Sequence, residues 1–243
     1  PLICFMETNN TDTMSTTQPT IKVVINNRNR LTTTKNMVEK LLSINPDEQI
    51  IILDNGSTYP PLLEWYQGIK DRVELRMGKN EGHLALWALG LDRELGEHFV
   101  YTDSDLELNP DFPQNWKEIM LNLINKYDIN KVGLALEIGD LPDFYRYKNQ
   151  VVRNEGRWWL TEVEEGVFSA DTDTTFALMR NNGHNEFKSL RVAKNGFTCR
   201  HMPFYVDLSN LSEEERYYLE HHDLFFTTQY TKQHINPELY NDI

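Results

Sequence analysis

The chain has 243 residues, of which 40% are hydrophobic and 11% aromatic, and its formal net charge is −13. This length and apolar content can fill the core of one large domain or two small ones. The acidic balance, with no cluster of lysine and arginine, argues against a nucleic-acid-binding protein and against docking on anionic lipid.

Cysteine content and hydropathy further limit the class of protein to which the chain can belong. The only cysteines are Cys4 and Cys199, too few for a disulfide framework or a cysteine-based zinc site, so a cytoplasmic, reducing setting is expected. No apolar run reaches the roughly 20 residues that cross a bilayer, so we expect no transmembrane segment. Residues 1–20 are rich in small polar residues and predict a flexible lead-in, followed by one domain over 21–243.

The first half of this domain alternates short apolar runs with amphipathic stretches. Strands are predicted at 21–25, 49–53, 73–77 and 99–102. Helices are predicted after the first three strands, the first with a cap at Thr32 or Thr33, the second from Pro60 and the third over 84–95. This alternation with short connections predicts an α/β fold with a doubly wound, mostly parallel sheet flanked by helices.

The second half follows a different pattern. A helix is predicted at 113–126, and strands are predicted at 131–137, 174–180 and 190–193. Because no crossover helix lies between the last two strands, the sheet is expected to become mixed. A last helix is predicted over 212–222, where Ser212 and Glu215 have the spacing of a capping box.

The stretch 140–170 is irregular and rich in aromatic residues. Aromatic faces stack on sugar rings, so these side chains could line a cleft for a sugar, and ordinary core packing explains them equally well. The residues in question are Tyr145, Tyr147, Trp158 and Trp159.

Two carboxylates follow the fourth predicted strand. Asp103 and Asp105 end the apolar run that begins at Phe99. The loops after the four strands, at 26–30, 54–58, 78–82 and 103–105, are expected to meet at the carboxyl edge of the sheet, where open α/β sheets bind ligands. Carboxylate oxygens there suit Mg²⁺ or Mn²⁺ with a phosphorylated ligand. An isolated Asp-x-Asp is more often a solvated turn, so the prediction of a ligand site depends on the three other loops at the same edge.

Taken together, the loops resemble a known family. Their motifs occur in the order and spacing of the GT-A nucleotide-sugar glycosyltransferases, most similar to family 2 and to small bacterial and viral sugar transferases: Asn29-Arg30, Asp54-Asn55-Gly56-Ser57, Asn80-x-Gly82 and Asp103-x-Asp105. The resemblance implies a GT-A fold in which residues 21–110 bind the nucleotide sugar and residues 111–243 bind the acceptor.

The resemblance also implies roles for individual residues. Asp105 would coordinate Mn²⁺ or Mg²⁺ directly, Asp103 would serve the ribose or reach the metal through water, and His201 would join the same metal. Contacts to the nucleotide, with a UDP-sugar as the expected donor, would come from Asn27, Arg28, Arg30, Asp54 and Asn80 together with Asp103. Asp54 also fits an ordinary Asx turn, and His201 also fits a structural histidine packed beside Pro203.

The catalytic base does not carry over, because the usual late Glu-Asp pair of the family is not evident. Asp171 and Asp173 share the spacing of the first pair but precede a strand, so they are candidates for the base or for a contact to the donor sugar, or form a polar loop. Asp207 and Asp223 are further candidates. Inversion is the default of the family, and retention stays open.

The sequence thus predicts a metal-dependent transferase that moves a hexose from a nucleotide diphosphate sugar to a hydroxyl group of a glycan or another acceptor. One alternative is a nucleotidyltransferase or sugar-phosphate pyrophosphorylase, which would carry a glycine-rich basic loop after its first strand, whereas 26–30 lacks glycine. The other alternative is a sugar-nucleotide-binding module without catalysis.

Overall fold

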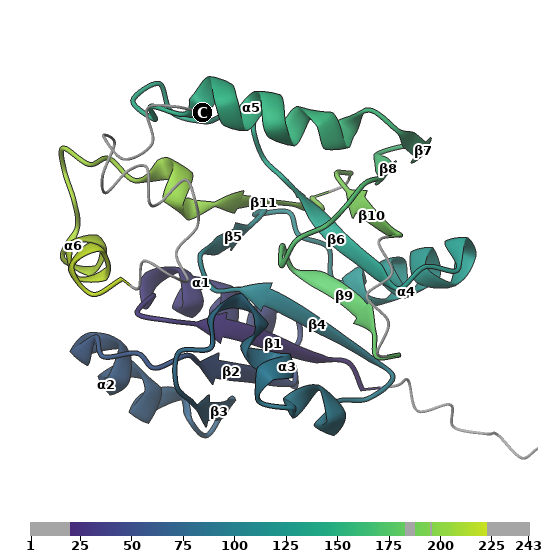
Figure 1. The fold of residues 1–243 in the computed structure, drawn as a ribbon. Helices are drawn as coiled ribbons and strands as arrows, with labels where there is room; N and C mark the ends of the chain where they lie inside the picture. Colours follow the sequence, from purple (N-terminus) through teal and green to yellow (C-terminus); the bar gives the residue numbers. More distant parts are fainter. Residues whose placement is uncertain (1–19, 183–187, 195, 223–243) are drawn as a thin grey trace, which may run out of the picture.

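The first half of the chain alternates strands and helices as predicted (Figure 1). The structure is a computed structural model that describes residues 20–182, 188–194 and 196–222, so the predicted lead-in falls almost wholly outside it. The elements are β1 (Lys22–Asn27), α1 (Thr32–Ile44), β2 (Ile50–Asp54), α2 (Pro60–Ile69), β3 (Glu74–Met77) and β4 (His98–Asp103). All four strands form where they were predicted. β1, β2 and β4 are buried apolar runs with a polar loop behind each, whereas β3 is a half-buried strand at the edge of the sheet.

The segment between β3 and β4 departs from the prediction of one helix over 84–95. It consists of η1 (Gly82–Leu84), α3 (Ala85–Ala88) and η2 (Leu91–Glu94). Gly90 takes a left-handed φ of 68°, which ends α3 after one turn. The apolar residues on which the helix was predicted do not share one buried face, since Leu84 and Trp87 are exposed and Leu95 is buried, and Gly90 divides the segment.

The second half holds short elements that the sequence only partly predicts. In chain order they are β5 (Leu106–Leu108), α4 (Trp116–Tyr127), β6 (Lys131–Leu136), α5 (Lys148–Gly156), η3 (Arg157–Trp159), β7 (Glu162–Glu164), β8 (Val167–Ser169), β9 (Ala177–Arg180), β10 (Ser189–Val192), β11 (Thr198–His201), η4 (Met202–Tyr205) and α6 (Glu213–Glu220). The region expected to be irregular therefore contains α5 and the hairpin of β7 and β8. None of the described helices is long and apolar enough to span a bilayer.

The sheet is parallel in its first half and mixed in its second, as predicted. The strand order is β3-β2-β1-β4-β9-β6-β10-β8-β7, with β3, β2, β1 and β4 parallel and β9 inserted antiparallel between β4 and β6. Strand β11 lies antiparallel to β5 and parallel to the end of β6, which builds a small second sheet beside the first.

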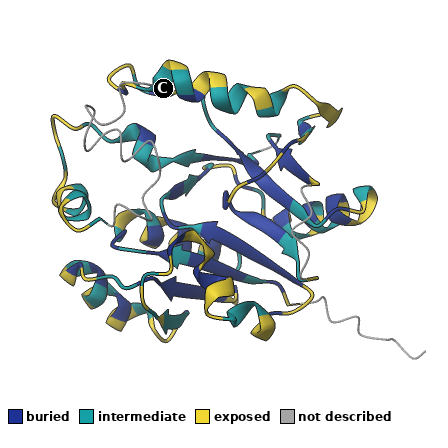
Figure 2. Cartoon of the chain, viewed as in Figure 1, coloured by how far each residue is buried: buried dark blue, intermediate teal, exposed yellow. Residues whose placement is uncertain are grey.

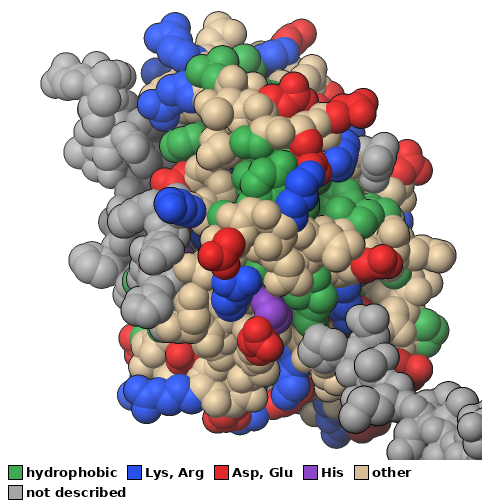
Figure 3. Space-filling model, turned by 90° about the vertical axis from the view of Figure 1, so that its right-hand side faces the viewer, with side chains coloured by type: hydrophobic (Ala, Val, Ile, Leu, Met, Phe, Trp, Pro, Cys, Tyr) green, Lys and Arg blue, Asp and Glu red, His purple; other side chains and the backbone are tan. Residues whose placement is uncertain are grey.

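Alternate side chains of the central strands enter two apolar layers, so these strands are buried on both faces (Figure 2). Val23 and Ile25 pack with α1 and α2, whereas Val24 packs on the opposite face with Leu86 and Tyr101. On the face of the molecule shown in Figure 3, acidic and basic side chains are interspersed and form no broad patch of one sign.

An aromatic cluster joins α4 to the start of β9. Phe176 contacts Phe112 and Trp116 with ring centroids 5.4 and 5.2 Å apart, and Phe197 contacts Phe112 at 5.6 Å. Phe176 takes a left-handed φ of 48° and is fully buried. Because this conformation interrupts the extended backbone, β9 begins at Ala177 rather than at residue 174 as predicted.

Candidate functional site

The predicted convergence of the loops is confirmed at the carboxyl edge of the parallel strands. Asn26 of β1 stands in register with Asp103 of β4. Asn26 and Asn55 both donate their side-chain amides to the carbonyl of Gly82, over 3.1 and 2.7 Å, and the side-chain oxygen of Asn55, Oδ1, accepts from the Glu81 amide at 2.7 Å. These asparagines therefore hold three of the four loops together, a role that the motif comparison did not assign to them.

Asp103 and Asp105 lie where the chain leaves the main sheet and enters the second one. Asp103 is the last residue of β4, and β5 begins directly after Asp105. The Asp103 amide donates to the carbonyl of Thr174 over 3.0 Å, and the Thr174 hydroxyl donates to the Asp103 carboxylate. The turn is thus fixed between two sheets rather than free in solvent, which is the setting that a ligand site requires.

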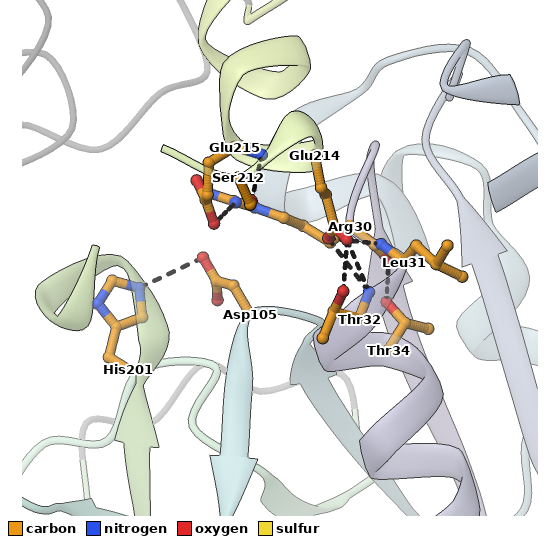
Figure 4. Close-up of polar contacts among 9 residues, drawn as sticks. All are labelled: Arg30, Leu31, Thr32, Thr34, Asp105, His201, Ser212, Glu214 and Glu215. Atoms are coloured by element: carbon orange, nitrogen blue, oxygen red, sulfur yellow. Dashed lines mark hydrogen bonds and ion pairs between the residues drawn. The ribbon is translucent and has the colours of Figure 1, made fainter. Parts of the chain in front are cut away.

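His201 lies beside Asp105, as the resemblance implied. Strand β11 places His201 opposite Leu106, and the amide of Met202 donates to the carbonyl of Asp105 at 2.9 Å. The His201 Nε2 atom is 3.4 Å from Asp105 Oδ2 (Figure 4). The other polar atom of each side chain, Asp105 Oδ1 and His201 Nδ1, is buried without a hydrogen-bond partner among the described residues.

The electrostatics of the two aspartates differ. Burial, and then the charge of Asp105, raises the pKa of Asp103 to about 7. Burial also opposes ionisation of Asp105, but His201 and Arg30 outweigh it and hold the pKa of Asp105 below its ordinary value. The pKa of His201 is raised in spite of burial, because Asp105 favours the imidazolium. Asp105 is therefore the carboxylate that carries a full negative charge near neutral pH.

The donor set at this turn fits a divalent cation in part. Within the part of the chain that the structure describes, no group of three or more His, Cys, Asp or Glu side chains is arranged to hold a metal. His201 Nε2 and Asp105 Oδ2 nevertheless face each other at 3.4 Å, Asp105 Oδ1 has no hydrogen-bond partner among the described residues, and both carboxylate oxygen and imidazole nitrogen suit Mn²⁺. A cation held mainly by substrate phosphates and water needs only one or two protein ligands.

Asn27 and Asp54 are occupied within the protein. The amide of Asn27 donates to the Tyr66 hydroxyl, which donates to Asp54 Oδ2, both at 2.8 Å. Asp54 Oδ1 accepts from the amide of Ser57 at 2.8 Å, which is the turn role that the sequence also allowed. Both side chains are fully buried, so a nucleotide contact by either requires this network to open and stays a prediction.

The side chains of Asn80 and Arg28 form hydrogen bonds with backbone groups near the site. The side-chain oxygen of Asn80, Oδ1, accepts from the amide of Gly82 at 3.2 Å. Arg28 donates to the carbonyls of Asn55 and His221, over 3.4 and 3.3 Å. Their predicted contacts to the nucleotide stay predictions, and both residues lie within the converging loops.

Arg30 pairs with helix α6 from the far end of the chain (Figure 4). Its guanidinium is 2.5 Å from Glu215 Oε1 and lies 3.6 Å from the ring centroid of Tyr218. Only half of the predicted capping box forms, because Ser212 accepts from the Glu215 amide while the Glu215 carboxylate turns to Arg30. The predicted phosphate contact of Arg30 would therefore have to share the guanidinium with Glu215.

The N-terminus of α1 is capped by α6 and not by Thr32 or Thr33 as predicted. The Glu214 carboxylate accepts from the amides of Leu31 and Thr32, over 2.8 and 3.1 Å, and from the Thr32 hydroxyl at 2.6 Å. A carboxylate at this position is favoured by the free amides and the dipole of the helix. Sequence reasoning missed this contact because its partners are far apart along the chain.

Replacing Glu215 with glutamine is expected to weaken the docking of α6 by about 2 kcal/mol, because it leaves the buried Arg30 guanidinium without its charged partner. Amide hydrogen exchange across α6 should then become roughly thirtyfold faster. Glu213→Gln, an exposed position on the same helix, is the control and should leave exchange unchanged. Equal exchange in both variants would show that Arg30 does not hold the helix.

Asp171 and Asp173 are exposed in the loop before β9. The backbone between them is held from two sides, because Lys131 donates to the carbonyl of Thr172 and Arg191 to the carbonyl of Asp171, each at 2.5 Å. Asp173 acts electrostatically on Asp103, so the loop lies near the first carboxylate pair. A role for either residue as the base stays a prediction.

The other sequence candidates are distributed outside this cluster. Asp207 accepts from the amide and hydroxyl of Ser209 in a local turn, and Asp223 lies outside the described residues. Tyr145 is buried against Tyr147 and Phe204, which is the core packing that the sequence also allowed. Trp158 lies beside Arg191, and Trp159 packs on Phe168.

Two known structures match the chain at low sequence identity. A mannosyltransferase from Pyrobaculum calidifontis, solved with GDP-Man and Mn²⁺, is 12% identical with a TM-score of 0.45, and the match covers 84% of this chain and 61% of that one. Glucosyl-3-phosphoglycerate synthase from Mycobacterium tuberculosis, solved with phosphoglyceric acid, is 18% identical with a TM-score of 0.42, covering 67% and 57%. The chain thus spans about three fifths of the length of these proteins.

Comparison at the sequence level settles the family. No protein with a curated description matches the chain. The family model described as glycosyl transferase family 2 matches residues 22–184, which include β1 to β4, the Asp103 and Asp105 turn and the loop before β9. This range covers more than half of the chain and agrees with the motifs in the converging loops. The chain belongs to glycosyl transferase family 2.

Proposed function

We propose that the chain is a metal-dependent glycosyltransferase that moves a hexose from a nucleotide diphosphate sugar, with UDP as the expected nucleotide, to a hydroxyl group of a glycan or another acceptor. The observation that carries the proposal is the pairing of Asp105 and His201 at the edge where the four loops meet. Family membership supports the reaction class. The halves 21–110 and 111–243 would hold the donor and the acceptor, respectively.

In this proposal Asp105 and His201 hold Mn²⁺ or Mg²⁺, and Asp103 supports the ribose or the hydration shell of the cation. The bound cation would neutralise the negative charge that develops on the departing diphosphate. The loops of Asn27 to Arg30, Asp54 and Asn80 lie where they can surround the nucleotide, since all three are joined to one another by hydrogen bonds.

The proton of the acceptor hydroxyl needs a base within hydrogen-bond reach. Asp173 is our candidate, with Asp171 as the second, because the loop that carries them is exposed and is bonded to the Asp103 turn through Thr174. An exposed carboxylate near the donor site can approach an acceptor without a rearrangement of the core.

A nucleotidyltransferase is less well supported by the loop after β1. That class needs a glycine-rich loop whose free amides surround phosphates. Here Asn29 takes the left-handed position with a φ of 54°, and its side-chain oxygen accepts from the amides of Thr58 and Tyr59, over 2.7 and 3.0 Å. The loop after β1 is therefore fixed by side chains to the loop after β2.

A screen of UDP, GDP and CMP by thermal shift and calorimetry, each with and without Mn²⁺, tests the proposal. UDP with Mn²⁺ is expected to stabilise the protein most, by about 2.7 kcal/mol at a hundredfold excess over Kd. Mn²⁺ alone should have little effect, because the protein supplies few ligands. If no nucleotide stabilises the protein in the presence of metal, the proposal is wrong. Slow Mn²⁺-dependent hydrolysis of UDP-glucose would distinguish an enzyme from a binding module.

A further inference from the structure

The segment before β9 reaches the Asp103 turn through one residue. Thr174 makes two hydrogen bonds with Asp103: its carbonyl accepts from the Asp103 amide at 3.0 Å, and its hydroxyl donates to Asp103 Oδ2. Among the described residues, the structure shows the Thr174 hydroxyl as the hydrogen-bond donor to the Asp103 carboxylate. Thr174 is 7% exposed, so water does not readily replace it.

The backbone on the far side of Thr174 is held rigidly. Thr175 exchanges two hydrogen bonds with Leu134 of β6, from its hydroxyl to the Leu134 carbonyl at 3.1 Å and from the Leu134 amide to its own carbonyl at 3.0 Å. The amide of Phe176 donates to the hydroxyl of Thr102 at 3.2 Å. The segment is therefore fastened to β4 and β6 at the same time.

Phe176 shows that this arrangement is imposed by its surroundings. A bulky residue with a φ of 48° is unfavourable and persists only where the neighbouring structure determines it. The ring of Phe176 is fully buried against Phe112 and Trp116, which fixes the backbone in this conformation. Unfavourable backbone of this kind gathers at functional sites, where it sets the position of a side chain.

We propose that Thr174 is a positioning residue, whose hydroxyl fixes the orientation of the Asp103 carboxylate for donor binding. The inference rests on the proposed function and goes beyond it, because Thr174 itself need not contact the cation or the nucleotide. With Oδ2 held by Thr174, Oδ1 of Asp103 is the oxygen that remains for the ligand. Without the hydroxyl, the carboxylate can rotate and bind the ligand in several orientations.

The chain offers a matched set of variants. Thr174→Val removes the hydroxyl at nearly constant volume, Thr174→Ser keeps it, and Thr175→Val removes a hydroxyl of the same exposure, 7%, that bonds to Leu134 and not to Asp103. Each variant is titrated with UDP and Mn²⁺ by calorimetry, and its hydrolysis of UDP-glucose is measured. Thermal unfolding without ligand reports the structural cost of each change.

We expect Thr174→Val to weaken the binding of UDP with Mn²⁺ by about ten- to a hundredfold, as for loss of a hydrogen bond to a charged group. Thr174→Ser should bind within about threefold of the wild type, and Thr175→Val should lose thermal stability while its affinity stays unchanged. In hydrolysis, the KM for UDP-glucose should rise in Thr174→Val more than kcat falls. A purely structural role would instead affect both valine variants alike.

Three results overturn the inference alone. The first two are wild-type affinity in Thr174→Val and equal loss of affinity in the two valine variants. Failure of Thr174→Ser to restore affinity also overturns it, because the serine hydroxyl can make the same bond. If the wild type itself binds no nucleotide with Mn²⁺, the proposed function fails and the inference falls with it, so the two failures are distinguishable.

Discussion

Replacing Asp105 with asparagine is expected to abolish Mn²⁺-dependent binding of UDP, with a loss of affinity of at least about a hundredfold. Asparagine keeps the shape of the side chain but removes the negative charge, and a neutral amide oxygen binds Mn²⁺ much more weakly than a carboxylate does. It also removes the carboxylate that lies 3.4 Å from His201, so the imidazole loses its charged neighbour. Calorimetric titration at neutral pH, with circular dichroism to establish that the variant is folded, measures the effect.

Asp143→Asn is the matched control for this experiment. The Asp143 side chain is 99% exposed and pairs with Lys148 at the surface, so the substitution changes the net charge equally without touching the site. It should bind UDP and Mn²⁺ like the wild type. Retention of Mn²⁺-dependent binding in Asp105→Asn would mean that the cation is held elsewhere, and the assignment of the site would have to be abandoned.

Replacing Trp116 with alanine should lower the free energy of unfolding by about 3–5 kcal/mol, because it leaves a large cavity in a packed core. Trp116 is 1% exposed and meets Phe176 at 5.2 Å and Phe112 at 6.0 Å between ring centroids. Urea unfolding followed by circular dichroism measures the loss.

Trp87→Ala provides the comparison, since Trp87 is 37% exposed and its ring lies against Tyr101 at the edge of the smaller apolar layer. Its removal should cost clearly less than that of Trp116. Similar losses for the two variants would contradict the expectation that burial in the aromatic cluster of Phe112, Trp116, Phe176 and Phe197 makes Trp116 the more important of the two for stability.

The parallel half of the fold could be predicted because a short stretch of sequence is enough to identify each of its strands. Strands β1, β2 and β4 are apolar runs that end in polar loops, and the order of β1 to β4 fixes the edge at which the loops meet. Strands β5, β7, β8 and β11 have three or four residues each, and what makes them strands is the neighbour with which they pair. Helix α5 was missed because only one of its residues, Val151, is buried.

The candidate site likewise contains residues that the sequence could predict and contacts that it could not. The Asp103 and Asp105 pair is visible in the sequence because it directly follows a buried strand, and the family resemblance led to His201. The contact of Arg30 with Glu215 joins residues that are 185 positions apart, and that of Thr174 with Asp103 joins residues 71 positions apart. No spacing rule along the chain can reveal such pairs, because only the packing of the two halves brings them together.

The small sheet of β5 and β11 has a consequence for the order of folding. It joins residues that are 93 positions apart, as in the contact of Arg200 with Glu107, whereas β1 and β2 are consecutive strands joined by one helix. Contacts between distant positions form slowly, since the entropy of closing a long loop is lost first. During refolding the parallel sheet should therefore form before β11 arrives. Asp105 would stand without His201 in that intermediate, so the capacity to bind a cation would be among the last properties that the refolding chain acquires.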